Sequence, residues 1–157
     1  MSDSLFPDME TYTQIKERHQ KEFSALPIKY AFGDEQFGEM LDSWHISRTN
    51  KEEWKQISSI GMGGYMLRKD IGLLHETLDR MDSEMAEFFK EDANVKSAII
   101  YELWNHEAIY SINPFCIVRE EILDAIELPS SRHNDKDILA IYGEAWREYR
   151  EKAVENM

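Results

Sequence analysis

The sequence predicts a mainly α fold of the α+β class, with about six helices packed on a small two-stranded β ribbon in a single domain. Three observations support this prediction. Apolar residues recur at helical spacing through most of the chain, and only two short segments alternate like strands. The 157 residues include only four Pro and seven Gly, which argues against a loop-rich β sandwich. Hydrophobic residues make up 42%, enough to enclose a core.

The first expected helix begins near Thr11, after an N-terminal extension over residues 1–10. Thr11 and Gln14 have the spacing of a capping box, in which each side chain bonds to the backbone N–H of the other residue. An apolar stripe follows at Tyr12, Ile15, His19, Phe23 and Leu26. Pro27 ends this helix, because proline lacks the N–H that a helix interior requires.

Two segments are expected to pair as the β ribbon. In residues 28–32 apolar and other side chains alternate, which is the period of a strand. Residues 58–67 contain the run Gly61-Met62-Gly63-Gly64, which predicts a bulge or a tight turn. A dinucleotide fingerprint requires glycine where Met66 stands, and no Gly-Lys-Ser/Thr of a phosphate loop follows. The glycine run therefore predicts a turn rather than a phosphate site.

Two helices are expected around this ribbon. Asp34 is positioned to cap a short helix, and Asp70 is positioned to cap the longest one, at about residues 71–92. Their predicted core-facing stripes are Phe37, Met40, Leu41 and Trp44 in the first, and Leu74, Leu78, Met81, Met85 and Phe88 in the second.

Three helices are expected in the last third of the chain. Asn94 is positioned to cap one that runs to about Tyr110. Asn113-Pro114 has the pattern of a cap and a first-turn proline for another, which ends near residue 128. Residues 129–134 form a possible short linker before the C-terminal helix. The stripe of that last helix is Ile138, Ile141, Tyr142, Ala145 and Tyr149.

The formal net charge of −13 disfavours direct binding to nucleic acid or to anionic membranes, and it favours partners with basic surfaces. An alternative is that the surplus carboxylates only keep the protein soluble. Cys116 is the only cysteine, which excludes an internal disulfide, and its apolar neighbours predict a buried thiol. The acidic N-terminus has no signal-peptide pattern, and no segment reaches the ~20 apolar residues of a membrane span, so we expect a cytoplasmic protein.

One side of the longest expected helix is rich in carboxylates. We expect these residues to form the partner-binding surface, because opposite charges speed association with a basic protein. They are Glu76, Asp79, Glu84, Glu87 and Glu91.

Glu102 and His106 form the most distinctive pair in the sequence. Four residues apart on a helix, they share the face that also carries Val95, Ile99 and Ile109. We expect both side chains to be buried and paired, because a buried unpaired charge costs several kcal/mol. On this interpretation His106→Ala would cost about 3–5 kcal/mol. The alternative is a metal-dependent or small-ligand hydrolase site at these two residues.

Other catalytic patterns are missing from the sequence. It contains no Gly-x-Ser-x-Gly elbow and no His-Glu-x-x-His helix, and Cys116 has no activating neighbour pattern. The sequence therefore favours a protein without catalytic residues, without a bound metal and without a cofactor.

Three motifs in order carry a resemblance to a known family. They are the segment from His19 to Phe37, the segment Gly61 to Asp70, and Tyr101-Glu102-Leu103-Trp104-Asn105-His106-Glu107. On these the chain resembles an uncharacterised family of small acidic proteins from Gram-positive gut bacteria and their phages and mobile elements. The resemblance covers most of residues 11–115 and brings no catalytic residues with it.

The resemblance implies a setting in which small acidic proteins block host defences. The resulting hypothesis is an inhibitor of a host nuclease, of anti-CRISPR or antirestriction type, which occupies a basic nucleic-acid cleft.

Overall fold

The computed structural model describes residues 10–157, so residues 1–9 of the expected extension lie outside the described part. Within that part the fold is mainly helical, as predicted, with six α-helices and one small antiparallel sheet. The sheet has three strands rather than two, because the glycine-rich segment folds back as a hairpin. The helices and strands are α1 (Tyr12–Ser24), β1 (Lys29–Tyr30), α2 (Asp34–Ser43), β2 (Ile57–Gly61), β3 (Gly64–Leu67), α3 (Ile71–Phe88), α4 (Asp92–Asn105), α5 (Ile117–Ala125) and α6 (Lys136–Glu155).

The described residues form two compact units. We call residues 16–82 the sheet unit, and residues 10–15 together with 83–157 the helical unit. The single domain expected over residues 11–157 stays a prediction. None of the described helices is long and apolar enough to cross a membrane.

The sheet of the sheet unit has the order β1-β3-β2. β3 pairs with β1 through Lys29 and Tyr65, so the predicted pairing of the two segments is confirmed. The hairpin turns at Met62 and Gly63, both of which have a left-handed backbone with φ of 51° and 76°. A Cβ atom at Gly63 would collide with the ring of Phe32, which explains why glycine is needed there.

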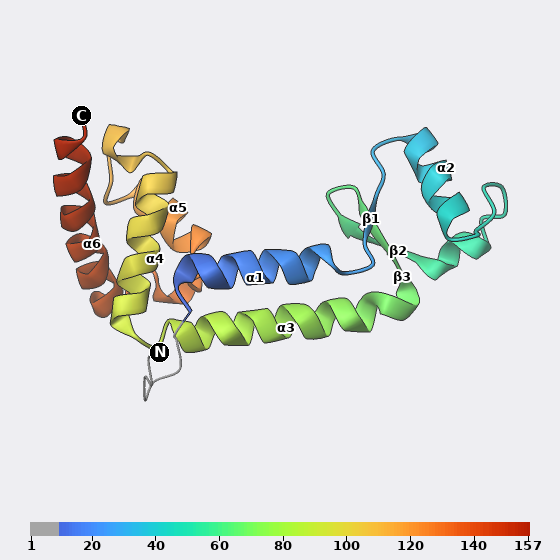
Figure 1. Ribbon diagram of the computed structural model, residues 1–157, viewed down its shortest axis with the longest axis horizontal. Coiled ribbons are helices and arrows are strands. Elements are labelled where there is room, and N and C mark those ends of the chain that lie inside the picture. Colours follow the sequence, from blue (N-terminus) through green and yellow to red (C-terminus); the bar gives the residue numbers. More distant parts are fainter. Residues whose placement is uncertain (1–9) are drawn as a thin grey trace, which may run out of the picture. The chain divides into compact units, whose positions relative to one another are not determined.

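The helices of the sheet unit supply several of its buried apolar side chains. Met40 and Leu41 of α2 are buried, as are Leu74 and Met81 of α3, whereas Leu78 is exposed, contrary to prediction. Within this unit α1 and α3 lie side by side, and an ion pair joins Arg80 to Glu22 (Figure 1).

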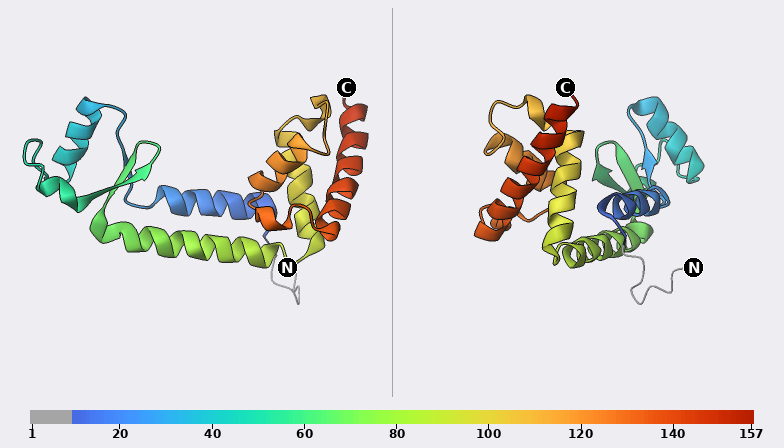
Figure 2. Two further views of the ribbon diagram at one scale, coloured as in Figure 1. Left: turned by 180° about the vertical axis from the view of Figure 1, so that it is seen from behind. Right: turned by 60° about the vertical axis from the view of Figure 1, so that its left-hand side comes forward.

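The helical unit holds the largest apolar core. Its helix α4 packs against both α6 and α5 (Figures 1 and 2). The predicted capping box of α1 is confirmed: the Thr11 N–H donates to Gln14 Oε1 over 2.8 Å, and the Gln14 N–H donates to Thr11 Oγ1 over 3.2 Å. The predicted stripe of α6 is confirmed too, since all five of its members are buried. Other fully buried members of this core are Ala98, Ile99, Leu103, Ile122, Leu123 and Ile126.

Several helix boundaries differ from the prediction. α3 ends at Phe88, because the Asn94 side chain donates to the Phe88 carbonyl instead of capping α4. α4 ends at Asn105, because Glu107 takes a left-handed backbone that stops the helix. α5 begins at Ile117, after a turn that contains Pro114. The thiol of Cys116 lies in this turn and is exposed, so the prediction of a buried cysteine is wrong.

Candidate functional site

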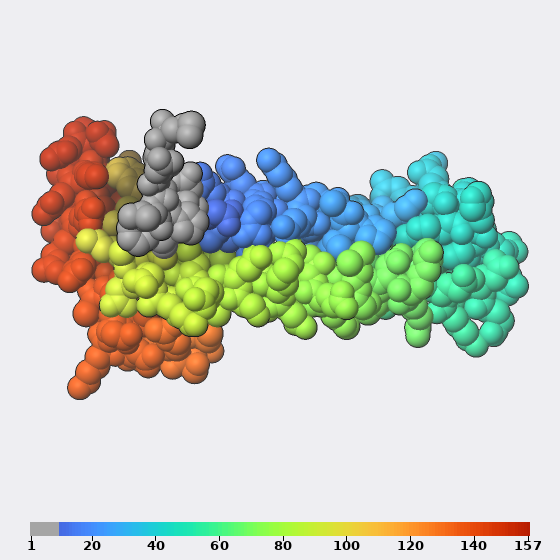
Figure 3. Space-filling view, turned by 60° about the horizontal axis from the view of Figure 1, so that its bottom comes forward, coloured from blue at the N-terminus to red at the C-terminus, as the bar shows by residue number. Residues whose placement is uncertain are grey.

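The predicted acidic surface lies mainly on α3. Glu76, Asp79 and Glu87 are exposed there, and Glu84 is half-buried. Glu87 forms a surface ion pair with Lys90, with 2.6 Å between Oε2 and Nζ. Glu91 is exposed beyond the end of α3, at the N-cap of α4, so the structure brings four of the five residues onto one helix. The side chains of α3, coloured green, lie open to view in Figure 3.

The carboxylates are unevenly divided along the chain. Residues 16–82 contain twelve Asp and Glu against ten Lys and Arg, whereas residues 83–157 contain sixteen against eight. Several exposed carboxylates of the second segment form no ion pair within residues 10–157: Glu91, Asp92, Glu107, Glu121, Glu127, Glu144, Glu151 and Glu155. The negative charge of the protein is therefore concentrated in the helical unit.

Glu102 lies in a polar cluster inside the helical unit and is only 1% exposed. The Tyr12 hydroxyl donates to Glu102 Oε1 over 2.8 Å, and Asn105 Nδ2 donates to Oε2 over 3.3 Å. Burial, followed by the hydrogen bond to Glu102 and the negative charges of Glu102 and Glu127, raises the pKa of the Tyr12 phenol strongly. The phenol is therefore a fixed donor to this carboxylate.

His106 lies at the edge of this cluster. Its Nε2 is 3.5 Å from Glu102 Oε2, but 34% of its side chain is exposed. The predicted burial of Glu102 is confirmed, and the predicted burial of His106 is wrong. The physical reason is the early end of α4: His106 is the C-cap residue rather than part of the buried helix face. Within residues 10–157 no group of three or more His, Cys, Asp or Glu side chains is arranged to hold a metal ion.

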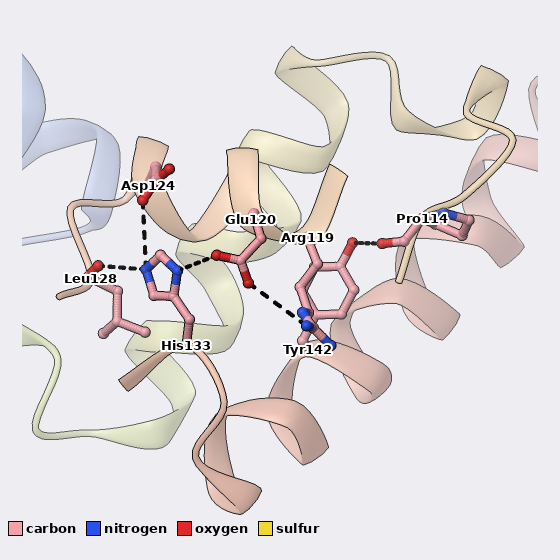
Figure 4. A network of polar contacts seen from close by, with 7 residues as sticks. All are labelled: Pro114, Arg119, Glu120, Asp124, Leu128, His133 and Tyr142. Atoms are coloured by element: carbon pink, nitrogen blue, oxygen red, sulfur yellow. Dashed lines mark hydrogen bonds and ion pairs between the residues drawn. The ribbon is translucent and has the colours of Figure 1, made fainter. Parts of the chain in front are cut away.

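A second histidine–carboxylate cluster surrounds His133, which the sequence analysis did not identify. His133 is 1% exposed and lies in the segment expected to be a linker, directly after the 3₁₀ turn Ser130–Arg132. Its Nδ1 is 2.7 Å from Glu120 Oε2, and its Nε2 is 2.7 Å from the Leu128 carbonyl oxygen (Figure 4). Asp124 Oδ1 lies 3.7 Å from the same Nε2. No local spacing rule relates residues 120 and 133, so the sequence holds no direct signal for this contact.

The charges in this second cluster are tightly coupled. The hydrogen bond from His133 lowers the pKa of Glu120. Burial lowers the pKa of His133, but the hydrogen bonds to Glu120 and to the Leu128 carbonyl and the nearby carboxylates outweigh it, so the net shift is upward. The cluster thus favours an imidazolium beside a carboxylate.

Arg119 and Tyr142 border the His133 cluster (Figure 4). Arg119 Nη2 is 3.7 Å from Glu120 Oε1, and its buried Nε has no hydrogen-bond partner within residues 10–157. The Tyr142 hydroxyl donates to the Pro114 carbonyl over 2.5 Å, and burial raises the pKa of this phenol to about 12. These contacts tie the turn before α5 to α6.

Comparison with known proteins gives a family and no activity. No curated protein and no solved structure matches the chain. A family model described as "Family of unknown function (DUF7659)" matches residues 11–148, which contain α1 to α5 and most of α6. The chain therefore belongs to this family, DUF7659.

Proposed function

We propose that this chain is a protein-binding module without catalytic activity, whose acidic surface occupies a basic surface of a partner protein. The observation that supports the proposal is the surplus of exposed carboxylates without ion pairs, together with the exposed carboxylates of α3. Such a field steers a basic partner toward the module and repels nucleic acid. The residues proposed to contact the partner are Glu76, Asp79, Glu84, Glu87 and Glu91.

The specific partner that we propose is a host nuclease with a basic cleft for DNA or RNA. The module would compete with nucleic acid for that cleft, as an inhibitor of a CRISPR effector or a restriction enzyme does. The charge of −13 supports this form of the proposal, because a basic cleft built for phosphates also attracts a dense group of carboxylates.

Two charge-reversal variants test the proposal. The first carries Glu76→Lys and Asp79→Lys on α3, and the control carries Glu144→Lys and Glu151→Lys on α6, so both change the net charge equally. The purified proteins are immobilised and incubated with bacterial lysate at low and at high salt. We expect the wild type and the control to capture a basic nuclease at low salt and to release it to added DNA.

The α3 variant should lose this capture. Equal losses in both variants would show that only net charge matters and would remove α3 as the contact surface. If the wild type captures no basic protein under either condition, the proposed function is wrong.

A further inference from the structure

The hydrogen bonds of His133 determine how many protons its ring carries. The Leu128 carbonyl can only accept, so Nε2 must donate a proton to it. Nδ1 faces a carboxylate oxygen of Glu120 at 2.7 Å, and that contact also requires a proton between the two atoms. This second proton can sit on Nδ1 or on Glu120 Oε2. In either case the pair contains one proton more than a neutral imidazole beside an ionised carboxylate.

The extra proton lies between His133 Nδ1 and Glu120 Oε2, whereas the cation Arg119 contacts the other carboxylate oxygen, Oε1. The charged groups that face the ring are Glu120 and Asp124, both from α5. Arg119 contacts Glu120 on its far oxygen, and α4, α6 and the Ser130–Arg132 turn contribute no further ion pair to His133 within residues 10–157. The ring itself is 1% exposed, so its hydrogen bonds are made to groups of the protein.

The contacts of His133 close the connection between α5 and α6. The Leu128 carbonyl belongs to the turn that ends α5, where the Leu128 N–H donates to the Leu123 carbonyl. Glu120 lies in the first turn of α5, with 45% of its side chain exposed. A neutral ring would keep the bond to Leu128 but would point a lone pair at Glu120. The carboxylate would then turn into the solvent to which it is already partly exposed.

We propose that the proton shared by His133 and Glu120 is a pH-sensitive latch that holds the connection over residues 126–135 closed on α5. This latch is independent of the proposed partner binding. Its contribution to stability is fully present below the unfolded-state pKa of histidine, 6.5, and is lost as pH rises through the raised pKa of folded His133. At acid pH the contact depends on the ionised form of Glu120. Its contribution to stability is fully present above the unfolded-state pKa of glutamate, 4.5, and is lost as the pH falls through the lowered pKa of folded Glu120.

Hydrogen exchange with mass spectrometry on the full chain tests the latch. Protection factors are compared between peptides from residues 126–135 and peptides from residues 95–103 of α4, between about pH 6 and pH 9. We expect protection in the 126–135 peptides to fall by up to tenfold per pH unit above the His133 midpoint. The α4 peptides should show a smaller loss.

Two variants and one NMR measurement test whether the pH dependence comes from the proton shared by His133 and Glu120. Glu120→Gln should abolish the pH dependence, because its side-chain amide can donate to the lone pair of a neutral ring. The control His75→Gln, at an exposed position on α3, should keep it. Nitrogen NMR of wild-type His133 at about pH 6 should show both ring nitrogens protonated. A singly protonated ring hydrogen-bonded to an ionised Glu120, or an unchanged pH dependence in Glu120→Gln, would overturn the proposal.

Discussion

The helical unit contains two glutamate–histidine pairs with opposite burial. In the first pair Glu102 is buried, while 34% of the His106 side chain is exposed. In the second pair His133 is buried, while 45% of the Glu120 side chain is exposed. The two pairs share their chemistry, but the group removed from water is a carboxylate in one and an imidazole in the other.

From this difference we infer that burial, rather than the presence of a pair, decides which residue matters for stability. A buried polar group must keep its partners, because an unsatisfied one costs about 1–3 kcal/mol. An exposed member of the same pair can be replaced by water at little cost. We therefore expect the effects of substitution to follow burial, with His133 above Glu102 and both far above His106.

The largest effect is expected for His133→Ala. The substitution removes a fully buried ring, leaves a cavity and leaves the Leu128 carbonyl without its donor. We expect a loss of about 3–4 kcal/mol in the free energy of unfolding, measured by urea denaturation. Glu120→Ala is the matched control and should cost about 1 kcal/mol, because water can reach that side of the pair. Equal losses in the two variants would contradict the burial argument.

A smaller but clear loss is expected for Glu102→Ala. The Tyr12 hydroxyl and Asn105 would lose their common acceptor inside the unit, at a cost of about 2–3 kcal/mol. Glu102→Gln retains an acceptor for Tyr12 and should cost about 1 kcal/mol. If both variants unfold at the wild-type urea midpoint, Glu102 is not an anchor of the core.

His106→Ala should have a minor effect, below about 1 kcal/mol, because the ring is partly exposed and Glu102 keeps its other donors. This expectation replaces the larger loss predicted from the sequence. Melting temperatures with and without Zn²⁺ or Mn²⁺ separate a structural contact from a ligand site. A metal-dependent rise in the wild type that disappears in His106→Ala would support the hydrolase alternative.

The same contrast explains what the sequence could and could not predict. The capping box of Thr11 and Gln14, the stripe of α6 and the burial of Glu102 all depend on spacings within a few residues along one helix. Glu120 and His133 are thirteen residues apart. Their contact depends on how the connection over residues 126–135 folds back on α5, and no periodic pattern encodes that path.

The exposure of His106 was missed for a related reason. The left-handed residue that follows a helix C-cap is commonly a glycine, but after α4 this position is occupied by Glu107. The apolar spacing continues past this residue to Ile109, so the pattern alone placed His106 inside a helix that had already ended.

The left-handed residues beside the two pairs allow the smallest and most specific test. Glu107 directly follows His106, and Glu127 directly precedes Leu128, with φ of 50° and 62°. A side chain in this conformation is strained and glycine is not, so Glu107→Gly and Glu127→Gly should each raise stability by about 0.5 kcal/mol. The control Glu121→Gly, within right-handed α5, should lower it by about 1 kcal/mol.

Equal gains at Glu107 and Glu127 would mean that only the backbone matters at both helix ends. The two glutamates differ in their surroundings, however, because the charge of Glu127 acts on buried Tyr12 and that of Glu107 acts on Tyr149. In the folded state both charges raise the pKa of a tyrosine and keep it protonated, so neither should oppose folding at neutral pH. We therefore expect equal gains in urea denaturation at neutral pH. A loss of stability at Glu127 alone would show that its side chain, and not only its backbone, holds the turn that His133 closes.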